Sequence, residues 1–479
     1  MDTRPPETLA LPHALPALRH DPSGRRRVDY RAVFALAAPL FLNSGVQAVL
    51  NLTDTWFLGR ISAQATAAVG GVYWFVIVLV LLLGGVSIAV QTLVAQAYGA
   101  GDRGRTAETV WSGLWVILAM APLFVLAGLA GPWLLAPTGL PPELKGLALE
   151  YWTPRVAGSV AGVALWCMSS FYNGIGRTGV TLGLMVAVGL INAILNRILG
   201  FGFDLGVTGI AWATTLAQAA GFALGLRIFL GARTRRDFAS HRHWRPRVIP
   251  MGRALALGLP MGLLPAADLI GTGLFQLMMV DLGTVAGAAT QVAMMMTSIA
   301  YMPAIGIASA GTTLVGQSIG AGDRDWARRV GNAAIKLTVG YMGLVSLVLA
   351  LAGPWSMPLF VNPADPDAAA VVRTAALLIW VGAAYQIFDG LNLGSAFALR
   401  GAGDVRIPAL LTLLLSWLGF VPLVHVLSFA PGAGWVSWLP QFGLGALGGW
   451  SALLIYVAVL GSTMTLRWRS GAWGRIELR

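Results

Sequence analysis

Three aspartates lie inside long apolar stretches of the sequence. Of the 20 acidic residues, only Asp54, Asp268 and Asp389 fall there, whereas the others fall in tails, loops or the ends of such stretches. If these stretches cross a membrane, a carboxylate is costly unless it faces a partner, a cavity or an ion, so each of the three indicates a functional site. The alternative is a hydrogen bond to a neighbouring helix, and it has most force for Asp54, near the end of its stretch.

Asp389 is preceded by a second polar side chain at helical spacing. Tyr385 lies four residues earlier, so both side chains project from one face of a helix. If the helix with Asp268 packs against this one, a second carboxylate joins them. Two carboxylates and a phenol offer oxygen ligands to a hard cation, or a pair of carboxyls that shares a proton. The spacing therefore predicts a cation-coupling site at Asp268, Tyr385 and Asp389, for Na+ or H+.

A weaker polar cluster is predicted in the first half of the chain. Asn192 and Asn196 have the same four-residue spacing, and Asp54 could join them. With a single carboxylate, hydrogen bonding between helices is an equal alternative to ion binding.

Other polar motifs carry less chemistry. Met294, Met295 and Met296 suit an adaptable binding pocket or ordinary packing. None of the five histidines has metal-site spacing, so no metal other than Na+ is expected. The Walker sequence G-x-x-x-x-G-K-[ST] is absent, which argues against ATP as the energy source, and no cofactor is expected.

The composition indicates that lipid surrounds most of the chain. Hydrophobic residues make up 57% of the 479 residues, charged residues 11%, and the mean hydropathy is +0.73. A span needs roughly 20 mostly apolar residues. About twelve such stretches lie near residues 33–58, 67–93, 107–132, 150–174, 178–202, 206–230, 252–277, 285–314, 327–352, 369–398, 405–428 and 440–466. The predicted fold is an all-α integral membrane protein.

The distribution of basic residues predicts the orientation in the membrane. Most of the 32 Lys and Arg residues fall on one side of these spans, and the five that fall on or toward the other side are Arg60, Lys145, Arg155, Arg197 and Arg373. The positive-inside rule then places both termini in the cytoplasm of a multi-pass inner (plasma) membrane protein. The formal charge of +12 is explained by topology, so no nucleic-acid partner is expected. The first thirty residues lack the apolar core of a cleavable signal.

Two halves of the chain repeat each other. Gly99-Ala100-Gly101-Asp102-Arg103 recurs as Gly320-Ala321-Gly322-Asp323-Arg324, with a glutamine three residues before each. Ala130-Gly131-Pro132-Trp133 recurs as Ala352-Gly353-Pro354-Trp355, Gly174 answers to Gly401, and Pro39 answers to Pro260, where helix bends are predicted. An even number of spans in each unit makes the repeats parallel, with substrate between them around a central cavity.

The predicted organisation follows from these patterns. It comprises a cytoplasmic N-terminal tail (1–32), an N-lobe of six spans (33–230), a basic, solvated cytoplasmic linker (231–251), a C-lobe of six spans (252–466) and a cytoplasmic C-terminal tail (467–479).

At these residues the sequence resembles the multidrug and toxic compound extrusion (MATE) family of secondary transporters, in its NorM-type branch. The motifs that carry the resemblance are Asp54-Thr55 with Gly59-Arg60, Gln96 through Asp102, Leu259-Pro260 with Asp268, Gln317 through Asp323, and Tyr385-Gln386 with Asp389 and Leu399-Arg400-Gly401. The resemblance implies a monomeric antiporter, not an enzyme, that exports cationic or amphipathic small molecules by alternating access. It assigns Asp268, Tyr385 and Asp389 to the cation site, and Asp54, Asn192 and Asn196 to the polar cluster.

The sequence departs from the family pattern at three places. Asp268 stands where NorM-type members usually have Glu, Thr290-Gln291 where His-Gln is usual, and Asn196 where some DinF-type members have Asp. The coupling ion is therefore left open.

Two other functions have partial support in the sequence. Gly-Ala-Gly-Asp, ending at Asp102, Asp323 and Asp404, is similar to a signature of intramembrane aspartyl proteases, but their Tyr-Asp partner motif is absent, and the glycines suit helix C-caps. A flippase for lipid-linked sugars would need a more basic cavity than these spans offer.

Overall fold

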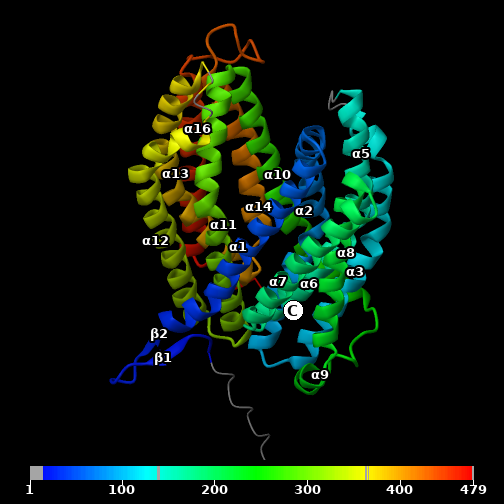
Figure 1. Ribbon diagram of the computed structural model, residues 1–479. Coiled ribbons are helices and arrows are strands. Elements are labelled where there is room, and N and C mark those ends of the chain that lie inside the picture. Colours follow the sequence, from blue (N-terminus) through cyan, green and yellow to red (C-terminus); the bar gives the residue numbers. More distant parts are fainter. Residues whose placement is uncertain (1–14, 137–140, 362–363, 365, 477–479) are drawn as a thin grey trace, which may run out of the picture.

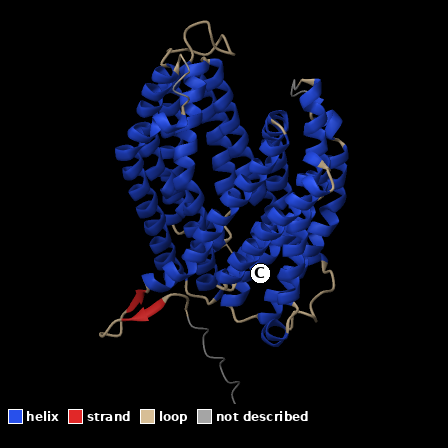
Figure 2. Cartoon of the chain, in the orientation of Figure 1, coloured by secondary structure: helices blue, strands red, loops and turns tan. Residues whose placement is uncertain are grey.

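The chain is almost entirely helical, with one small β-hairpin, as Figure 2 shows. The computed structural model describes residues 15–136, 141–361, 364 and 366–476, so residues 1–14 and 477–479 of the predicted tails lie outside the described residues. Among the described residues, eleven helical segments are long and apolar enough to cross a membrane. They are α1 (Tyr30–Ile61), α2 (Ala63–Gly99), α3 (Arg103–Leu129), α7 with a π-helix (Thr178–Leu195, Asn196–Gly202), α8 (Gly206–Phe229), α10 (Val248–Asp281), α11 (Thr284–Gly320), α12 (Arg324–Ser356), α13 (Ala368–Ala402), α14 with a π-helix and α15 (Arg406–Leu414, Leu415–Phe420, Val421–Ser428), and α16 (Gly445–Arg469).

The twelfth crossing consists of two shorter helices in tandem. α5 (Pro142–Ala157) and α6 (Ser159–Gly174) are separated only by Gly158, and both pack along α2 and α8. Each is too short to cross alone, but together they are long enough. The remaining short elements are β1 (Leu18–His20), β2 (Arg26–Val28), α4 (Gly131–Leu134), α9 (Ala232–Phe238) and the 3-10 helices Met357–Phe360 and Ala472–Arg475. The predicted all-α membrane fold is confirmed.

The Gly-Ala-Gly-Asp motifs act as helix boundaries. Their second glycines, Gly101, Gly322 and Gly403, all have φ between 76° and 83°, the left-handed conformation that ends a helix. Asp102 and Asp323 then cap the next helices through 2.8 Å hydrogen bonds from the N–H groups of Arg105 and Trp326. This explains the motif without proteolytic chemistry.

The helices form two bundles whose first helices cross between them (Figure 1). α2 to α8 make one bundle and α11 to α16 the other. α1 contacts α7 of the first bundle and α11 of the second, whereas α10 contacts α11 and α14 of the second bundle and α2 of the first. The contact of α1 with α11 and that of α10 with α2 are equivalent. A two-fold axis between parallel repeats would map one contact onto the other. The bundles lie closest at the end that carries α9 and the hairpin, here called the hairpin end, and diverge toward the other end.

The repeat is visible at atomic detail at the hairpin end. Gln96 Nε2 donates to the carbonyl oxygen of Gly401 at 3.0 Å, and its counterpart Gln317 donates to that of Gly174 at 2.8 Å. Just before them, Thr92 Oγ1 donates to Arg400 O at 3.1 Å and Thr313 Oγ1 to Asn173 O at 3.0 Å. Each bundle therefore holds the other through equivalent bonds, which close this end of the molecule.

Two glycines allow the backbones of α2 and α11 to meet there. A Cβ added to Gly99 would overlap the backbone of Gln317, and one added to Gly320 would overlap the backbone of Gln96. Small residues at such crossings are typical of helix packing in lipid.

Gly320→Ala is expected to lower the stability of the protein by about 1–3 kcal/mol, because a backbone contact must open to admit the methyl group. Gly340→Ala is the matched control, since no heavy atom lies within 4 Å of its added Cβ, and alanine is the better helix former. The measurement is the fraction of detergent-solubilised protein that stays monodisperse after heating. Equal thermal profiles for the two variants would contradict the close crossing.

The hairpin attaches the start of α1 to the second bundle. Arg26 pairs with Asp323, Trp326 Nε1 donates to Pro16 O at 2.9 Å, and Arg329 donates to Arg26 O at 3.0 Å. Burial raises the pKa of Asp323, but the bond from the Trp326 N–H and the Arg26 guanidinium outweigh it and hold this pKa below its usual value. The pair is therefore ionised at neutral pH.

The segment between the bundles is attached to α3 by three contacts. Trp111 and Trp115 of α3 donate to the carbonyl oxygens of Ser240 and Trp244 at 2.7 and 2.6 Å, and Arg247 pairs with Glu108 at 2.8 Å. Its arginines and most of its other residues are exposed, so the segment is attached to α3 at these three contacts and open to solvent elsewhere.

Candidate functional site

The two carboxylates of the second repeat differ in burial, since Asp389 is buried and Asp268 is half-buried. Asp389, in α13, is only 8% exposed, and its Oδ1 accepts one hydrogen bond, of 3.3 Å, from Asn392 Nδ2. Asp268, in α10, accepts a 2.9 Å bond from the hydroxyl of Tyr456 in α16. Within the described part of the chain these are the only side-chain donors to either carboxylate. Each carboxylate therefore keeps an oxygen without a protein donor there.

The sequence interpretation assumed that the helices of Asp268 and Asp389 pack against each other. In the structure, other helices lie between them. α10 lies along α11, α14 and α15, whereas α13 lies along α11, α12 and α16. α11 and α16 therefore connect them, and the charges of Asp268 and Asp389 lie near enough to interact. Tyr301 of α11 lies within electrostatic range of Asp268, Tyr385 and Asp389 together. The predicted residues thus face one region, but they share no hydrogen bond.

Tyr385 hydrogen-bonds Thr297 and lies within electrostatic range of Asp389, but none of its hydrogen bonds in the described residues goes to a carboxylate. Its ring lies 6.1 Å from that of Trp450, whose Nε1 donates to Thr290 Oγ1 at 3.2 Å. The tyrosine that bonds a carboxylate is Tyr456, which sequence reasoning missed. The available signal was weak, because a tyrosine in an apolar span occurs in many cores and interfaces.

The first bundle brings the predicted polar cluster into one network. Asn196 Nδ2 donates to Asp54 Oδ1 at 2.6 Å, and Thr214 Oγ1 donates to Asp54 Oδ2 at 3.0 Å. Asn192 joins through Thr214 Oγ1 and through Asn196 Nδ2, each at 3.2 Å. Thr214 of α8 was missed, since a lone threonine in a span gives no pattern. Both oxygens of Asp54 are satisfied by neutral donors.

A π-helix occurs at the same place in both repeats. One begins at Asn196, within the polar cluster, and the other covers Leu415–Phe420, in the equivalent fifth span of the second bundle. Phe420 stacks on Tyr456, with ring centroids 4.9 Å apart. π-Helical turns of this kind are frequent at functional sites.

The other residues singled out in the sequence are two prolines and a run of methionines. Pro39 and Pro260 lie inside the continuous helices α1 and α10, where proline removes a backbone hydrogen bond. In the methionine run, Met296 is buried and Met295 is 57% exposed, so the run does not form one lining surface. Within the described residues, no group of three His, Cys, Asp or Glu side chains could hold a metal.

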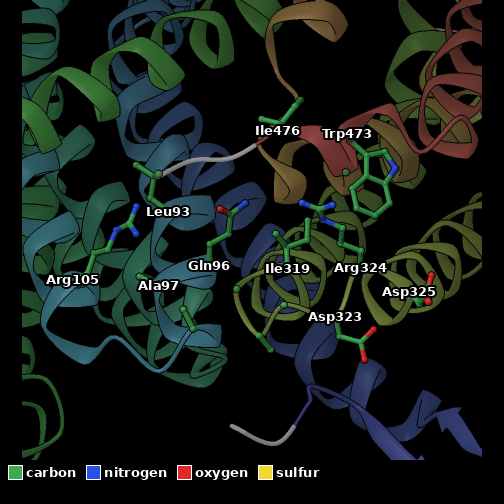
Figure 3. Close-up of a pocket in the computed structure, with 15 residues that line it drawn as sticks. Leu93, Gln96, Ala97, Arg105, Ile319, Asp323, Arg324, Asp325, Trp473 and Ile476 are labelled. Atoms are coloured by element: carbon green, nitrogen blue, oxygen red, sulfur yellow. The ribbon is translucent and has the colours of Figure 1, made fainter.

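A pocket of about 760 Å³ lies at the hairpin end, away from these carboxylates. Figure 3 shows Gln96 and Arg105 on one side of it and Arg324, Asp325 and Trp473 on the other. Its lining includes Ala100 and Gly320–Asp323 of the repeated Gly-Ala-Gly-Asp motifs, together with Gln96 of the closed contact, so the pocket lies beside that contact.

Comparisons with known proteins agree with this architecture. The family model described as MatE matches residues 39–198 and 269–424. The chain is 36% identical to the multidrug resistance protein NorM of Burkholderia vietnamiensis, over 89% of this chain and 91% of that protein. It is 30% identical to the probable multidrug resistance protein NorM of Rhizobium meliloti (strain 1021), over 92% of both.

A solved structure shows the same fold. A crystal structure of MATE in complex with MaL6 superposes with a TM-score of 0.80 at 20% identity, covering 93% of this chain and 97% of that one. The family match spans both repeats and contains five of the six polar residues of the two clusters. The sixth, Asp268, lies one residue before the second matched segment. The chain therefore belongs to the MATE family of membrane transporters.

Proposed function

We propose that this protein is a secondary active antiporter that exports drugs and other xenobiotic small molecules in exchange for Na+ or H+. The observation that carries the proposal is the contrast between the two bundles. Asp54 is saturated by neutral donors, whereas Asp268 and Asp389 each have one described donor. A carboxylate in lipid with an unmatched oxygen suits a cation or a proton that comes and goes.

The second bundle has the chemistry for coupling. Two carboxylates and the hydroxyls of Tyr301, Tyr385 and Tyr456 provide several oxygens for a hard cation such as Na+. Alternatively, one of the two carboxylates could take up a proton, since their charges interact and each lies in an apolar span. Binding of Na+ or H+ would relieve the repulsion between the two carboxylates. Substrate binding would compete with binding of that ion.

The structure has the geometry expected of one extreme of an alternating cycle. The bonds from Gln96 and Gln317 close the hairpin end, and the bundles diverge toward the other. In the proposed cycle, the N-lobe (33–230) and the C-lobe (252–466) separate at the hairpin end, and Pro39 and Pro260 allow α1 and α10 to bend. The pocket beside the contact would then widen into the cytoplasmic opening.

The substrate class is inferred from the relatives. The Burkholderia and Rhizobium proteins are named as multidrug resistance proteins. Cationic and amphipathic molecules are proposed, handled by a monomer in the inner membrane. A transport assay with such drugs, run beside a lipid-flipping assay on the same vesicles, tests this function. Flipping of lipid-linked sugar without drug transport would overturn it in favour of the flippase alternative.

Both termini are expected in the cytoplasm, together with residues 231–251, because the exposed arginines gather at the hairpin end. Fusions of an alkaline phosphatase and of a fluorescent protein at residues 245 and 475 measure this directly. Fluorescence without phosphatase activity at both positions is the expected result. Phosphatase activity at either position would contradict the orientation.

A further inference from the structure

One buried hydroxyl in the second bundle has no hydrogen-bond partner. Ser416 is 1% exposed, and its Oγ makes no hydrogen bond within the described residues. Hydroxyls elsewhere in the spans commonly donate to the carbonyl oxygen four residues earlier, as those of Ser318 and Thr338 do at 2.7 and 2.9 Å. Ser416 lies in the π-helix Leu415–Phe420 and makes no such bond. A buried hydroxyl without a partner costs free energy, so Ser416 is a candidate for a bond that forms only in another state of the protein.

Ser416 lies beside the hydrogen bond between Tyr456 and Asp268. Its Oγ rests against α10 at Gly271, where an added Cβ would come within 2.6 Å of it. Gly271 follows Asp268 by three residues, so the two lie on one face of α10. Ser416 is also near enough to the Tyr456 hydroxyl to interact with it, and Phe420 of the same π-helix stacks on the Tyr456 ring at 4.9 Å. The π-helix therefore places an uncommitted hydroxyl next to the one that bonds Asp268.

An ion that binds between Asp268 and Tyr456 ends the bond that joins them. A phenol has one hydrogen, and Tyr456 donates it to Asp268 Oδ1 at 2.9 Å. Na+ at this place needs the lone pairs of both oxygens, so the hydroxyl hydrogen has to point away from the cation. A proton on Oδ1 has the same effect, because the carboxyl then donates and the phenol oxygen accepts. With either ion, the hydrogen of Tyr456 needs a second acceptor.

We propose that Ser416 is a positioning residue of the coupling site, which accepts the hydroxyl hydrogen of Tyr456 when an ion occupies Asp268. A serine side chain reorients by rotation about one bond, so its Oγ can meet this hydrogen without movement of the helix. Because the new bond exists only in the ion-bound state, Ser416 strengthens ion binding without contact with the ion. This inference rests on the proposed function, because it adds a residue to the ion-exchange site.

The test measures how strongly Na+ or H+ displaces a bound drug. A fluorescent cationic rhodamine is bound to the purified full-length protein, and its release is followed by fluorescence anisotropy as Na+ is added at fixed pH, or as the pH is lowered without Na+. For Ser416→Ala, we expect the half-displacing concentration of the active ion to rise by roughly 2–10-fold, the range for one lost neutral hydrogen bond. The affinity for the dye at high pH without Na+ should stay at the wild-type level, which also shows that the variant is folded.

A double-substitution cycle with Tyr456→Phe separates this role from packing. If Ser416 acts through the Tyr456 hydroxyl, Ser416→Ala should cause no further loss in the Tyr456→Phe protein. Ser428→Ala is the matched control, because Ser428 is also 1% exposed with an unpartnered Oγ, but lies against Gly449. It should respond to the ion as wild type does. Additive losses in the cycle, or an equal loss in Ser428→Ala, would overturn the inference.

The wild-type protein separates failure of this inference from failure of the proposed function. Displacement of the dye by Na+ or H+ from wild type and from Ser416→Ala at the same concentration would reject the role of Ser416 and leave ion exchange standing. Dye binding to wild type that neither ion affects would overturn the exchange itself, and the role of Ser416 with it.

Discussion

Asp389→Asn is expected to reduce ion-driven efflux to background while the protein still inserts and purifies as wild type does. The substitution removes the negative charge and keeps the side-chain volume, so packing in α13 is preserved. Without that charge, the affinity for the coupling cation should fall by roughly 10–100-fold, the range for a lost charged partner, and substrate could no longer be exchanged for it. Drug efflux from energised cells and ion binding to purified protein are the two measurements.

The control for this variant is Asp204→Asn, at an exposed position outside the helices. Asp204 has φ of 54°, and asparagine tolerates that left-handed conformation. It should transport as wild type does. Uphill efflux by Asp389→Asn would remove Asp389 from the coupling site.

The second large effect is expected at Asp268, where two variants separate charge from hydrogen bonding. Asp268→Asn removes the carboxylate and should abolish ion-driven efflux as Asp389→Asn does. Tyr456→Phe removes only the 2.9 Å hydrogen bond to that carboxylate, so it should lower efflux by roughly tenfold or less. Efflux rates at several external ion concentrations would show whether Tyr456→Phe is partly restored by more ion. Equal and complete losses that no ion concentration restores would mean that Tyr456 acts through structure instead.

Much of this arrangement could be predicted from the sequence, because lipid makes polar residues conspicuous. The twelve spans, the repeat and the three intramembrane aspartates all follow from breaks in an apolar pattern. The cluster of Asp54, Asn192 and Asn196 was predictable for the same reason, since the four-residue spacing fixes the two asparagines on one face.

The contacts between helices that are distant in the sequence could not be predicted, because they depend on three-dimensional packing. The spacing of Tyr385 and Asp389 was correctly interpreted as one helix face, but α10 meets α11 and α16 rather than α13, so the hydroxyl that reaches Asp268 comes from Tyr456. The depth of Arg155 along its crossing was not predictable either, because the sequence does not show that two tandem helices form that crossing. The tandem helices α5 and α6 carry Arg155 farther inward than a single span starting near residue 150 would.

Ion-coupled export is tested most directly by a measurement in inverted membrane vesicles. Uptake of a fluorescent cationic drug into the vesicles is followed while a Na+ gradient and a pH gradient are imposed separately, with Asp389→Asn vesicles as the blank. Uphill uptake is expected under at least one gradient, and none is expected in the Asp389→Asn vesicles. Uptake driven by Na+ alone would identify Na+, and uptake driven by the pH gradient with Na+ absent on both sides would identify H+. Equilibration of the drug without accumulation under either gradient, or equal accumulation by the Asp389→Asn vesicles, would contradict ion-coupled export through Asp389.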